Sequence, residues 1–308
     1  MNFASLTEWW DLDLPLIDVR ESQEERALSS AESRVVVYLP FSTLVSGERS
    51  CELPPRHVAF GILVEEDHDE AQKEQRQQKL QDFFFATTSK ATQQSRKPWQ
   101  VSVTLIASDD LWGQSKEIGI YKSVDNLQCI TSTFEPLSRL WQPDLMLPNI
   151  LWPILEQSLP LIKEDCEIWD LGSGAGRDAC FLAEKIKALS LKHCSVIGID
   201  NHKGSAKRCE PFWKHRQVAE LTRAENLNLN KMELVEQQLK GGTVVCFNAV
   251  RFLNRKLNVF LAGYSDLKPG TLFAVSHFCK PYPGASWDFD HPKVSLILLE
   301  GKRQLLGT

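Results

Sequence analysis

Short apolar segments alternate with polar, helix-forming segments along the chain, and this pattern predicts an α/β protein. In the N-terminal part the apolar runs have the length of strands, and the run Val35-Val36-Val37 has the β-branched composition typical of strands. The strands predicted there lie at residues 14–21, 34–41, 57–64 and 101–106. They predict a small α/β domain over residues 1–130.

From residue 167 the alternation becomes regular and predicts a doubly wound, Rossmann-like parallel sheet flanked by helices. The strands are expected at residues 167–171, 195–200, within 218–229, at 243–248 and at 271–276, and the helices at 147–159, 177–189, 207–216 and 251–261. Residues 294–306 have the pattern of a single helix. The last edge of the sheet would then lack a neighbouring strand.

Two polar segments mark the limits of these regions. Residues 131–146 are rich in proline and polar side chains and predict a linker before a second domain over residues 147–308. Residues 67–94 are rich in Glu, Gln and Lys, which predicts a solvated helix or a partly disordered insertion. The aromatic run 83–85 is expected to anchor the end of this segment to its domain.

Composition narrows the class of protein. The 308 residues carry a net charge of -5, so no bulk positive field favours nucleic acid. The eight cysteines form no CxxC pair, which argues for reduced thiols and against a metal site such as zinc. The N-terminus lacks the features of a secretory signal, and no apolar run approaches about 18 residues. We therefore expect a cytoplasmic protein without a membrane segment, with the nucleus left open.

The most informative segment follows the predicted strand 167–171. Glycine occupies every second position of the loop, at Gly172, Gly174 and Gly176, and a helix begins directly afterwards. Glycine lets the main chain turn tightly and approach a ligand closely. The loop amides and the helix N-terminus would then face a ligand above the strand. This pattern predicts a binding site for a nucleotide-type cofactor.

Two acidic residues indicate which cofactor. Asp200 closes the second predicted strand, where a carboxylate can accept hydrogen bonds from ribose hydroxyls. A nicotinamide dinucleotide would use the same feature, but its fingerprint requires glycine where this chain has Arg177. Asp170, two residues before the first glycine, would repel a pyrophosphate and suits an ammonium group. The pattern favours a nucleoside that carries an amino acid.

Residues 170–179, 196–201, 250–255 and 267–272 resemble the S-adenosylmethionine-dependent class I methyltransferases, in particular the tellurite-resistance and thiopurine type. The resemblance extends over about residues 138–308. The family sheet ends in an antiparallel hairpin, which the helix predicted at 294–306 would replace. The resemblance implies S-adenosylmethionine as cofactor and the following cofactor-binding residues: Asp170, Gly172, Ser173, Gly174, Gly176, Arg177, Asp178, Asp200, Asn201, Asn228, Leu229, Asn248 and Ala249.

Within that set, Asn228 departs from the family pattern, which usually has an aspartate beside the adenine. The amide keeps an acceptor oxygen but loses the charge, so weaker cofactor binding is expected. For catalysis the candidates are His277 and His291 as general bases and Arg251 as a partner for an anionic substrate. No residue of the chain is assigned to catalysis beyond these candidates.

The N-terminal region shows a second resemblance. Residues 16–21, followed by residues 39–44, resemble the opening of a rhodanese-like domain over roughly residues 5–120. In that family the strand matching residues 58–64 leads into a loop whose cysteine carries a persulfide. This chain has an acidic loop there, Glu65-Glu66-Asp67-His68-Asp69-Glu70, without a cysteine. The resemblance therefore implies a rhodanese-like domain without sulfurtransferase activity.

The methyl acceptor is expected to be a small molecule. Residues 247–250 lack the acidic or amide-proline motif that enzymes use for flipped DNA bases, so DNA is not expected, whereas RNA stays open. The rhodanese-like domain would deliver substrate or dock a partner protein. The alternative function is a pseudoenzyme scaffold that binds a partner and transfers little or no methyl group.

Overall fold

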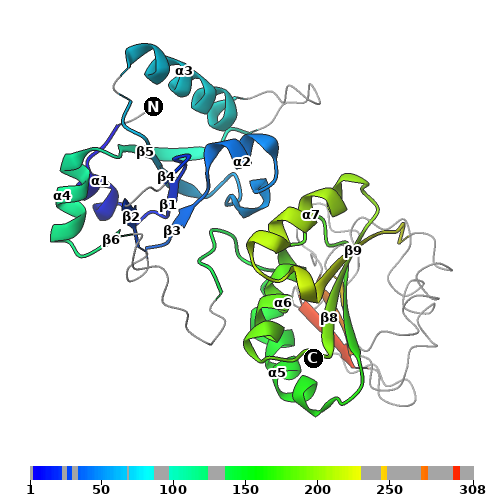
Figure 1. Cartoon of the computed structure of the whole chain (residues 1–308). Helices are drawn as coiled ribbons and strands as arrows, with labels where there is room; N and C mark the ends of the chain where they lie inside the picture. Colours follow the sequence, from blue (N-terminus) through cyan, green and yellow to red (C-terminus); the bar gives the residue numbers. More distant parts are fainter. Residues whose placement is uncertain are drawn as a thin grey trace. The chain divides into compact units, whose positions relative to one another are not determined.

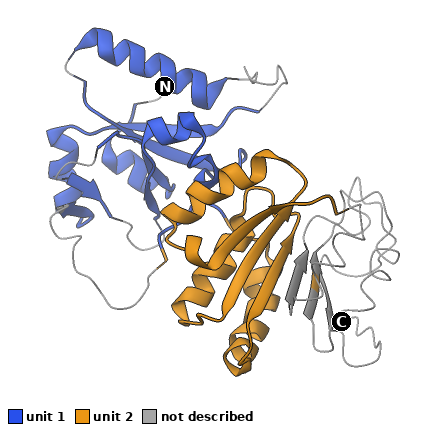
Figure 2. Cartoon of the chain, turned by 45° about the vertical axis from the view of Figure 1, so that its right-hand side comes forward, with its two compact units in different colours: residues 1–132, 137–141 blue, residues 133–136, 142–308 orange. Residues whose placement is uncertain are grey.

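The computed structural model describes residues 3–22, 26–29, 34–67, 69–86, 97–123, 136–229, 244–247, 272–276 and 294–298. The chain forms two compact units, shown in blue and orange in Figure 2. Unit 1 contains residues 1–132 and 137–141, and unit 2 contains residues 133–136 and 142–308. Each unit is built around its own sheet. The domain and linker limits expected from the sequence stay predictions.

Unit 1 contains a four-stranded parallel sheet with the order β3-β1-β4-β5. Its strands are β1 (Leu16–Asp18), β3 (Val36–Tyr38), β4 (Ala59–Val64) and β5 (Gln100–Ile106). Each lies within or overlaps one of the four predicted segments, so these strand predictions are confirmed. A separate antiparallel pair joins β2 (Arg26–Leu28) to β6 (Tyr121–Ser123).

Helices cover both faces of this sheet (Figure 1). On one face, Ile17 and Ile62 pack in a core with Phe84, beside α2 (Phe41–Ser46) and α3 (Glu70–Leu80). On the other face, Leu16 and Leu63 pack with side chains of α1 (Leu6–Asp11) and α4 (Asp109–Glu117). Successive side chains of a strand point to opposite faces, so the apolar runs of β1 and β4 supply both cores.

The polar segment after β4 is largely the solvated helix predicted from its composition. Asp69 caps α3 by accepting a hydrogen bond from the Ala71 N–H, and most side chains of α3 are exposed or half-buried. The helix continues into η2 (Gln81–Phe85), where Phe84 is fully buried. The aromatic run therefore anchors the segment as expected. Residues 87–96 lie outside the described part of the chain.

Unit 2 contains a six-stranded sheet with the order β12-β11-β10-β7-β8-β9. The following five strands run parallel to one another: β7 (Cys166–Leu171), β8 (Cys194–Asp200), β9 (Thr222–Asn226), β10 (Val244–Phe247) and β11 (Leu272–Ser276). All five agree with the predicted positions. The parallel, Rossmann-like sheet expected from the sequence is thus present.

The C-terminal segment corrects one prediction. Residues 294–298 were expected to begin a helix, but they form the strand β12 (Val294–Leu298), antiparallel to β11. Ladder hydrogen bonds to β11 stabilise the extended form, and a short apolar run does not by itself distinguish strand from helix. The edge of β11 is therefore paired, contrary to the expectation of an unpaired edge. Residues 299–308 lie outside the described part.

The helices α5 (Trp152–Ser158), α6 (Arg177–Ala188) and α7 (Gly204–His215) contact one another on one side of this sheet (Figure 1). The turns η4 (Leu147–Leu151) and η5 (Leu159–Leu161) flank α5, and η6 (Ala219–Leu221) follows α7. The helices predicted at 147–159, 177–189 and 207–216 are confirmed, and the one at 251–261 lies outside the described residues. None of the described helices is long and apolar enough to cross a bilayer.

Candidate functional site

The order of the strands in unit 2 locates a candidate binding site. From β7 the chain proceeds through β8 and β9 on one side of the sheet, and then continues with β10 and β11 on the other side of β7. The side on which successive strands join the sheet therefore changes between β7 and β10. In open α/β sheets, ligands bind outside the carboxyl ends of the strands at such a switch point. The glycine loop, residues 172–176, begins where β7 ends.

The three glycines of this loop have left-handed backbone conformations, with φ of +80° at Gly172, +55° at Gly174 and +72° at Gly176. A Cβ at Gly176 would lie 2.7 Å from the Cys209 sulfur and 2.8 Å from the Trp213 ring, so glycine is required for packing against α7. A Cβ at Gly174 would meet no atom within 4 Å. Gly174 therefore faces open space, where a ligand can approach the main chain.

The loop is held in place by main-chain hydrogen bonds. The N–H groups of Gly172 and Ser173 donate to the Ile199 carbonyl at 2.7 and 2.9 Å. At the other end of the loop, the Trp213 indole N–H donates to the Gly176 carbonyl at 2.9 Å. These bonds fix the loop to β8 and α7. The conformation of the glycine loop is thus fixed by contacts within the protein itself.

Asp200, the last residue of β8, accepts three hydrogen bonds through its side chain. Its Oδ2 atom accepts from the Gly174 N–H at 3.0 Å. Its Oδ1 atom accepts from the His202 N–H at 2.7 Å and from the Ser205 hydroxyl at 3.1 Å. Oδ2 keeps one lone pair for a further donor. The carboxylate is therefore oriented before a ligand hydroxyl reaches it.

Asp170 is the most unusual residue of the site. It is fully buried, and neither of its carboxyl oxygens has a hydrogen-bond partner within the described residues. Burial raises its pKa well above the ordinary value, and the nearby carboxylates of Asp178, Asp200 and Asp144 raise it further. The Ala179 main-chain N–H, which does not reach good hydrogen-bond geometry with either oxygen, lowers the Asp170 pKa and so acts in the opposite direction. A buried polar group without a partner is costly, and it marks a place where a ligand or water supplies the missing contact.

Four carboxylates thus surround the beginning of α6. The Asp178 side chain accepts a hydrogen bond from the Asp144 N–H at 3.0 Å, which brings the segment before η4 beside the helix. The negative field of Asp144, Asp178 and Asp200 favours a cation over an anion in the space above the loop. Such a field is suited to a ligand with an ammonium or sulfonium group.

The structure brings most of the sequence-predicted cofactor residues to one edge of the sheet. Asn226, the last residue of β9, pairs with Asp200 in the ladder and donates its amide N–H to the Asp200 carbonyl at 3.0 Å. Asn228 and Leu229 follow it, the first exposed and the second buried. The remaining residues at this edge are Asp170, Gly172, Ser173, Gly174, Gly176, Arg177, Asp178, Asp200 and Asn201. Their role in binding stays a prediction.

Five other predicted residues lie outside the described part of the chain, namely Asn248, Ala249, Arg251, His277 and His291. The sequence-based reasoning also missed Asp144 and Ser205. Asp144 is 34 positions from the helix it contacts, so no local pattern indicated it. Ser205 follows Asp200 by five positions, a spacing from which a contact across the strand–helix turn was detectable.

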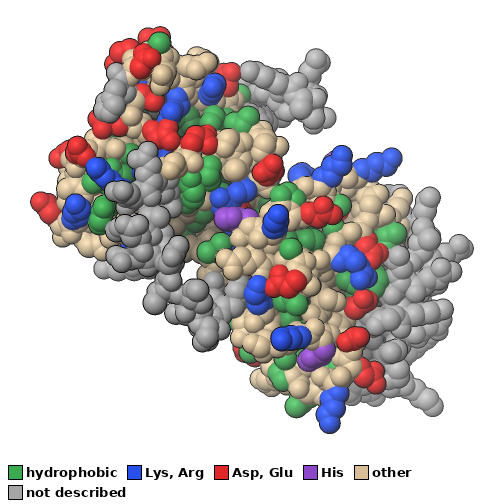
Figure 3. All heavy atoms as spheres, in the orientation of Figure 1, with side chains coloured by type: hydrophobic (Ala, Val, Ile, Leu, Met, Phe, Trp, Pro, Cys, Tyr) green, Lys and Arg blue, Asp and Glu red, His purple; other side chains and the backbone are tan. Residues whose placement is uncertain are grey.

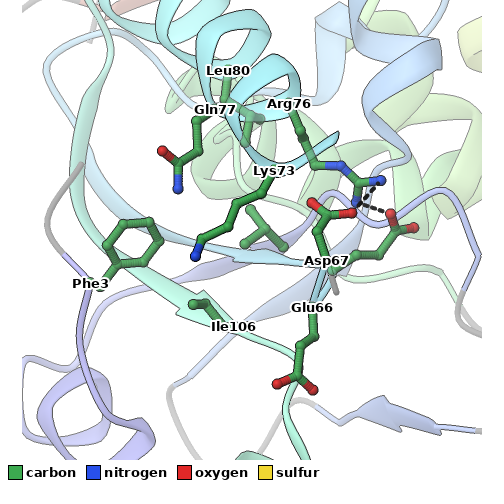
Figure 4. Close-up of a pocket in the computed structure, with 10 residues that line it drawn as sticks. Phe3, Glu66, Asp67, Lys73, Arg76, Gln77, Leu80 and Ile106 are labelled. Atoms are coloured by element: carbon green, nitrogen blue, oxygen red, sulfur yellow. Dashed lines mark hydrogen bonds and ion pairs between the residues drawn. The ribbon is translucent and has the colours of Figure 1, made fainter. Parts of the chain in front are cut away.

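Unit 1 has a cavity of its own at the carboxyl ends of β4 and β5. A space of about 130 Å³ lies under α3, and Figure 4 shows Phe3, Lys73 and Ile106 around it. An adjoining space of about 400 Å³ is lined by Glu21 and Phe41, among others. The loop beneath α3 is the position where the rhodanese-like resemblance places a cysteine.

An arginine of α3 pairs with carboxylates of this acidic loop. The Arg76 guanidinium forms ion pairs with Glu65 and with Asp67, the latter at 3.3 Å (Figure 4). Burial lowers the Arg76 pKa, and Glu21 partly offsets this effect. Two of the carboxylates of the loop lining this cavity therefore share one cation, and no thiol is among the residues that line it.

In the described ranges, no group of three or more His, Cys, Asp or Glu side chains is arranged to hold a metal ion. Cys51, Cys166, Cys180, Cys194 and Cys209 are buried and form no disulfide. Cys166 and Cys194 are the first residues of β7 and β8, one position before the predicted starts of these strands.

No protein-family model matches the sequence, and no curated protein matches it. Several solved methyltransferase structures are similar to part of the chain. An RNA methyltransferase from Salinibacter ruber in complex with S-adenosyl-L-homocysteine is 23% identical over 49% of this chain and 94% of that chain, with a TM-score of 0.32. A SAM-dependent methyltransferase from Geobacter sulfurreducens, also in complex with S-adenosyl-L-homocysteine, is 13% identical over 40% of this chain, with a TM-score of 0.30.

Coclaurine N-methyltransferase bound to N-methylheliamine and SAH is 17% identical over 42% of this chain, with a TM-score of 0.33. The chain spans only 46% of the Geobacter sulfurreducens protein and 35% of coclaurine N-methyltransferase. These similarities are distant, so the function of the site depends on its own residues and geometry.

Proposed function

We propose that unit 2 is an S-adenosylmethionine-dependent methyltransferase domain of class I. The observation that carries this proposal is Asp170, a buried carboxyl without a hydrogen-bond partner in the described chain, directly before a glycine loop at the switch point of a parallel sheet. A ligand with a cationic amino-acid part supplies the donor that this carboxyl lacks.

The described residues offer a contact for the ammonium group, the methionine chain, the ribose and the adenine of such a cofactor. Asp170 would accept from the ammonium group, and the open side of Gly174 would admit the methionine chain. Asp200 would accept a ribose hydroxyl at Oδ2, next to the hydrogen bond from Gly174. Asn228 and Leu229 would border the adenine. By resemblance, Asn248 and Ala249 would lie near the methyl group.

The chemistry asked of the protein is mainly positioning. A bound sulfonium supplies an activated methyl group, so the chain must align the acceptor and exclude water. A thiol acceptor needs no dedicated base, whereas a nitrogen or oxygen acceptor often does, and His277 and His291 are the candidates. Arg251 is the candidate partner for an anionic acceptor.

The electrostatics of the site distinguish this proposal from a nicotinamide enzyme. A pyrophosphate above the loop would lie in the field of Asp178, Asp200 and Asp144, which disfavours an anion. Arg177 also occupies the position of the third dinucleotide glycine. Both features favour a cationic nucleoside.

A small-molecule acceptor is the one that the chain supports best. On the described face shown in Figure 3, acidic and basic side chains are intermixed, in keeping with the net charge of -5. Such a surface offers less to a polyanion than a basic stripe would. RNA remains the alternative acceptor, and DNA is not expected.

For unit 1 we propose a rhodanese-like domain that performs no sulfur transfer and serves in docking a protein or delivering substrate. The support is the acidic loop after β4, which Arg76 closes and which lacks a nucleophilic thiol. The test is a thiosulfate sulfurtransferase assay on the full chain. Activity above that of a heat-denatured sample would contradict the proposal.

The cofactor proposal is tested by titration calorimetry of the full chain with S-adenosylhomocysteine. Binding in the micromolar range is expected, and no binding up to millimolar concentration refutes the proposal. Radiolabelled methyl transfer into fractionated cell extract then shows whether the acceptor is a small molecule, RNA or protein. Transfer is expected to disappear in Asp170→Ala.

The second candidate is a pseudoenzyme scaffold. Asn228 in place of the family aspartate and the loss of the unit 1 cysteine favour it. The two candidates differ in one measurement, since only the methyltransferase transfers label to a physiological acceptor.

A further inference from the structure

We propose that the site beside Asp170 exchanges a proton for its ligand, so that Asp170 is a neutral acid in the free protein and a carboxylate when an ammonium group is bound. The proposal rests on the cofactor proposed above, because that cofactor's amino-acid part carries the ammonium group. It adds a property of the site that the resemblance does not imply, namely obligatory release of a proton on binding.

The position of Asp170 in the sheet is the first support. In the β ladders it lies between Gly198 of β8 and Cys246 of β10, on a strand flanked on both sides. Its exposed fraction is 0%, and both carboxyl oxygens lack a partner in the described part of the chain. An ionised carboxylate in such a place has no hydrogen bond of good geometry from the described residues to stabilise its charge.

The surrounding charges are the second support. The described groups that act on Asp170 are Asp178 of α6, Asp200 of β8, Asp144 before η4 and the Ala179 N–H in the first turn of α6. Three of these four are carboxylates, and a side-chain cation is not among them. Like charges at close range cannot all ionise, and the buried member of such a group keeps its proton.

The binding step balances as follows. The Asp170 carboxylic acid and a ligand ammonium group form a carboxylate–ammonium pair, and the carboxyl proton passes to solvent. The ligand cation favours the ionised form because an opposite charge now lies within hydrogen-bond distance. Affinity for an ammonium-bearing ligand should therefore rise with pH, by up to about tenfold per pH unit while Asp170 is protonated in the free protein.

The experiment compares two ligands on the full chain. S-Adenosylhomocysteine carries the ammonium group, whereas 5′-methylthioadenosine keeps the adenine, ribose and sulfur without it. Both are titrated calorimetrically in buffers of different ionisation enthalpy at pH of about 5.5 to 7.0, where an α-ammonium group stays charged. The dependence of the observed heat on the buffer gives the number of protons released.

The expected result is a larger proton release for S-adenosylhomocysteine than for 5′-methylthioadenosine, with one proton as the upper limit of the difference. Protons that are bound or released through the adenosine part, which both ligands share, cancel in the comparison. Equal proton release for the two ligands overturns the proposal while leaving the cofactor assignment intact. Binding of neither ligand overturns the cofactor assignment and this proposal together.

Two variants locate the proton. Asp170→Asn keeps the shape of the side chain but does not ionise, so the additional proton release should disappear. Asp178→Asn keeps the acceptor oxygen for the Asp144 N–H and removes one neighbouring charge. It should reduce the additional release at a given pH. If Asp170→Asn still releases the additional proton, that proton comes from another group and the proposal is overturned.

Discussion

The Asp200 side chain joins the end of β8 to the glycine loop, because its Oδ2 atom accepts a hydrogen bond from the Gly174 N–H at 3.0 Å. This hydrogen bond therefore joins the proposed ribose acceptor to the glycine loop that is proposed to hold the methionine part. Ser205 and the His202 N–H hold the other carboxylate oxygen. Substitutions of Asp200 and Ser205 should distinguish the contribution of the Gly174 hydrogen bond to cofactor binding from that of the bonds that orient the carboxylate.

Asp200→Asn should weaken S-adenosylhomocysteine binding by about 10- to 100-fold, because an amide that keeps its oxygen toward Ser205 offers no acceptor to the Gly174 N–H. Ser205→Ala removes one donor to Oδ1 and leaves the Gly174 contact in place. Its effect should stay within about tenfold. Titration calorimetry of both variants checks this order, and equal losses would contradict the role of the Gly174 contact.

Gly176→Ala should destabilise unit 2 by about 2–4 kcal/mol, because the added methyl group meets Cys209 and Trp213 at a left-handed backbone position. Gly174→Ala is the matched control, since its methyl group meets no atom within 4 Å. It should cost only about 1 kcal/mol of stability and yet reduce cofactor binding. Urea denaturation and calorimetry measure the two effects. A Gly174→Ala protein with unchanged cofactor affinity would show that the open side of the loop is not the binding side.

The buried ion pair between Glu184 of α6 and Arg216 after α7 should be important for the stability of unit 2. Both side chains are 1% exposed, and the closest contact is 2.5 Å. Glu184→Gln should lower the free energy of unfolding by about 3–5 kcal/mol, because an uncompensated charge stays buried. Arg223→Ala breaks exposed pairs with Glu167 and Glu225 and should cost less than about 1 kcal/mol. Similar losses in both variants, measured in urea, would argue against the buried pair.

The stability of the ligand-free protein should fall as pH rises, through Asp170. Its folded-state pKa is raised above that of the unfolded chain, so the folded state retains a proton that the unfolded state releases. The contribution is fully present below the unfolded pKa of about 3.9 and is lost as pH rises through the folded pKa. The stability of Asp170→Asn does not decrease in this way. The free energy of unfolding of the variant should therefore rise, relative to that of the natural protein, as pH increases. Urea denaturation between about pH 5 and 8 tests this, and a constant difference would contradict it.

Local patterns were sufficient for most elements of unit 2. The alternation of apolar and polar segments placed its five parallel strands, and the glycines with Asp170 and Asp200 indicated the edge where a ligand would bind. These signals are local, since a glycine at positive φ or an acidic strand end is encoded by a few neighbouring residues. The same reasoning was wrong for residues 294–298, where pairing with β11 determines the conformation.

The sequence alone determined which residue types stand at the strand ends and that Gly172 to Gly176 can form a tight turn. The tertiary structure determined which of these residues come into contact. Asp144 reaches Asp178, Gly174 reaches Asp200, and Asp170 loses its water only when β8 and β10 flank β7. Burial and the distance between charges are properties of packed segments far apart in sequence, and for this reason the protonation of Asp170 is not readable from its neighbours along the chain.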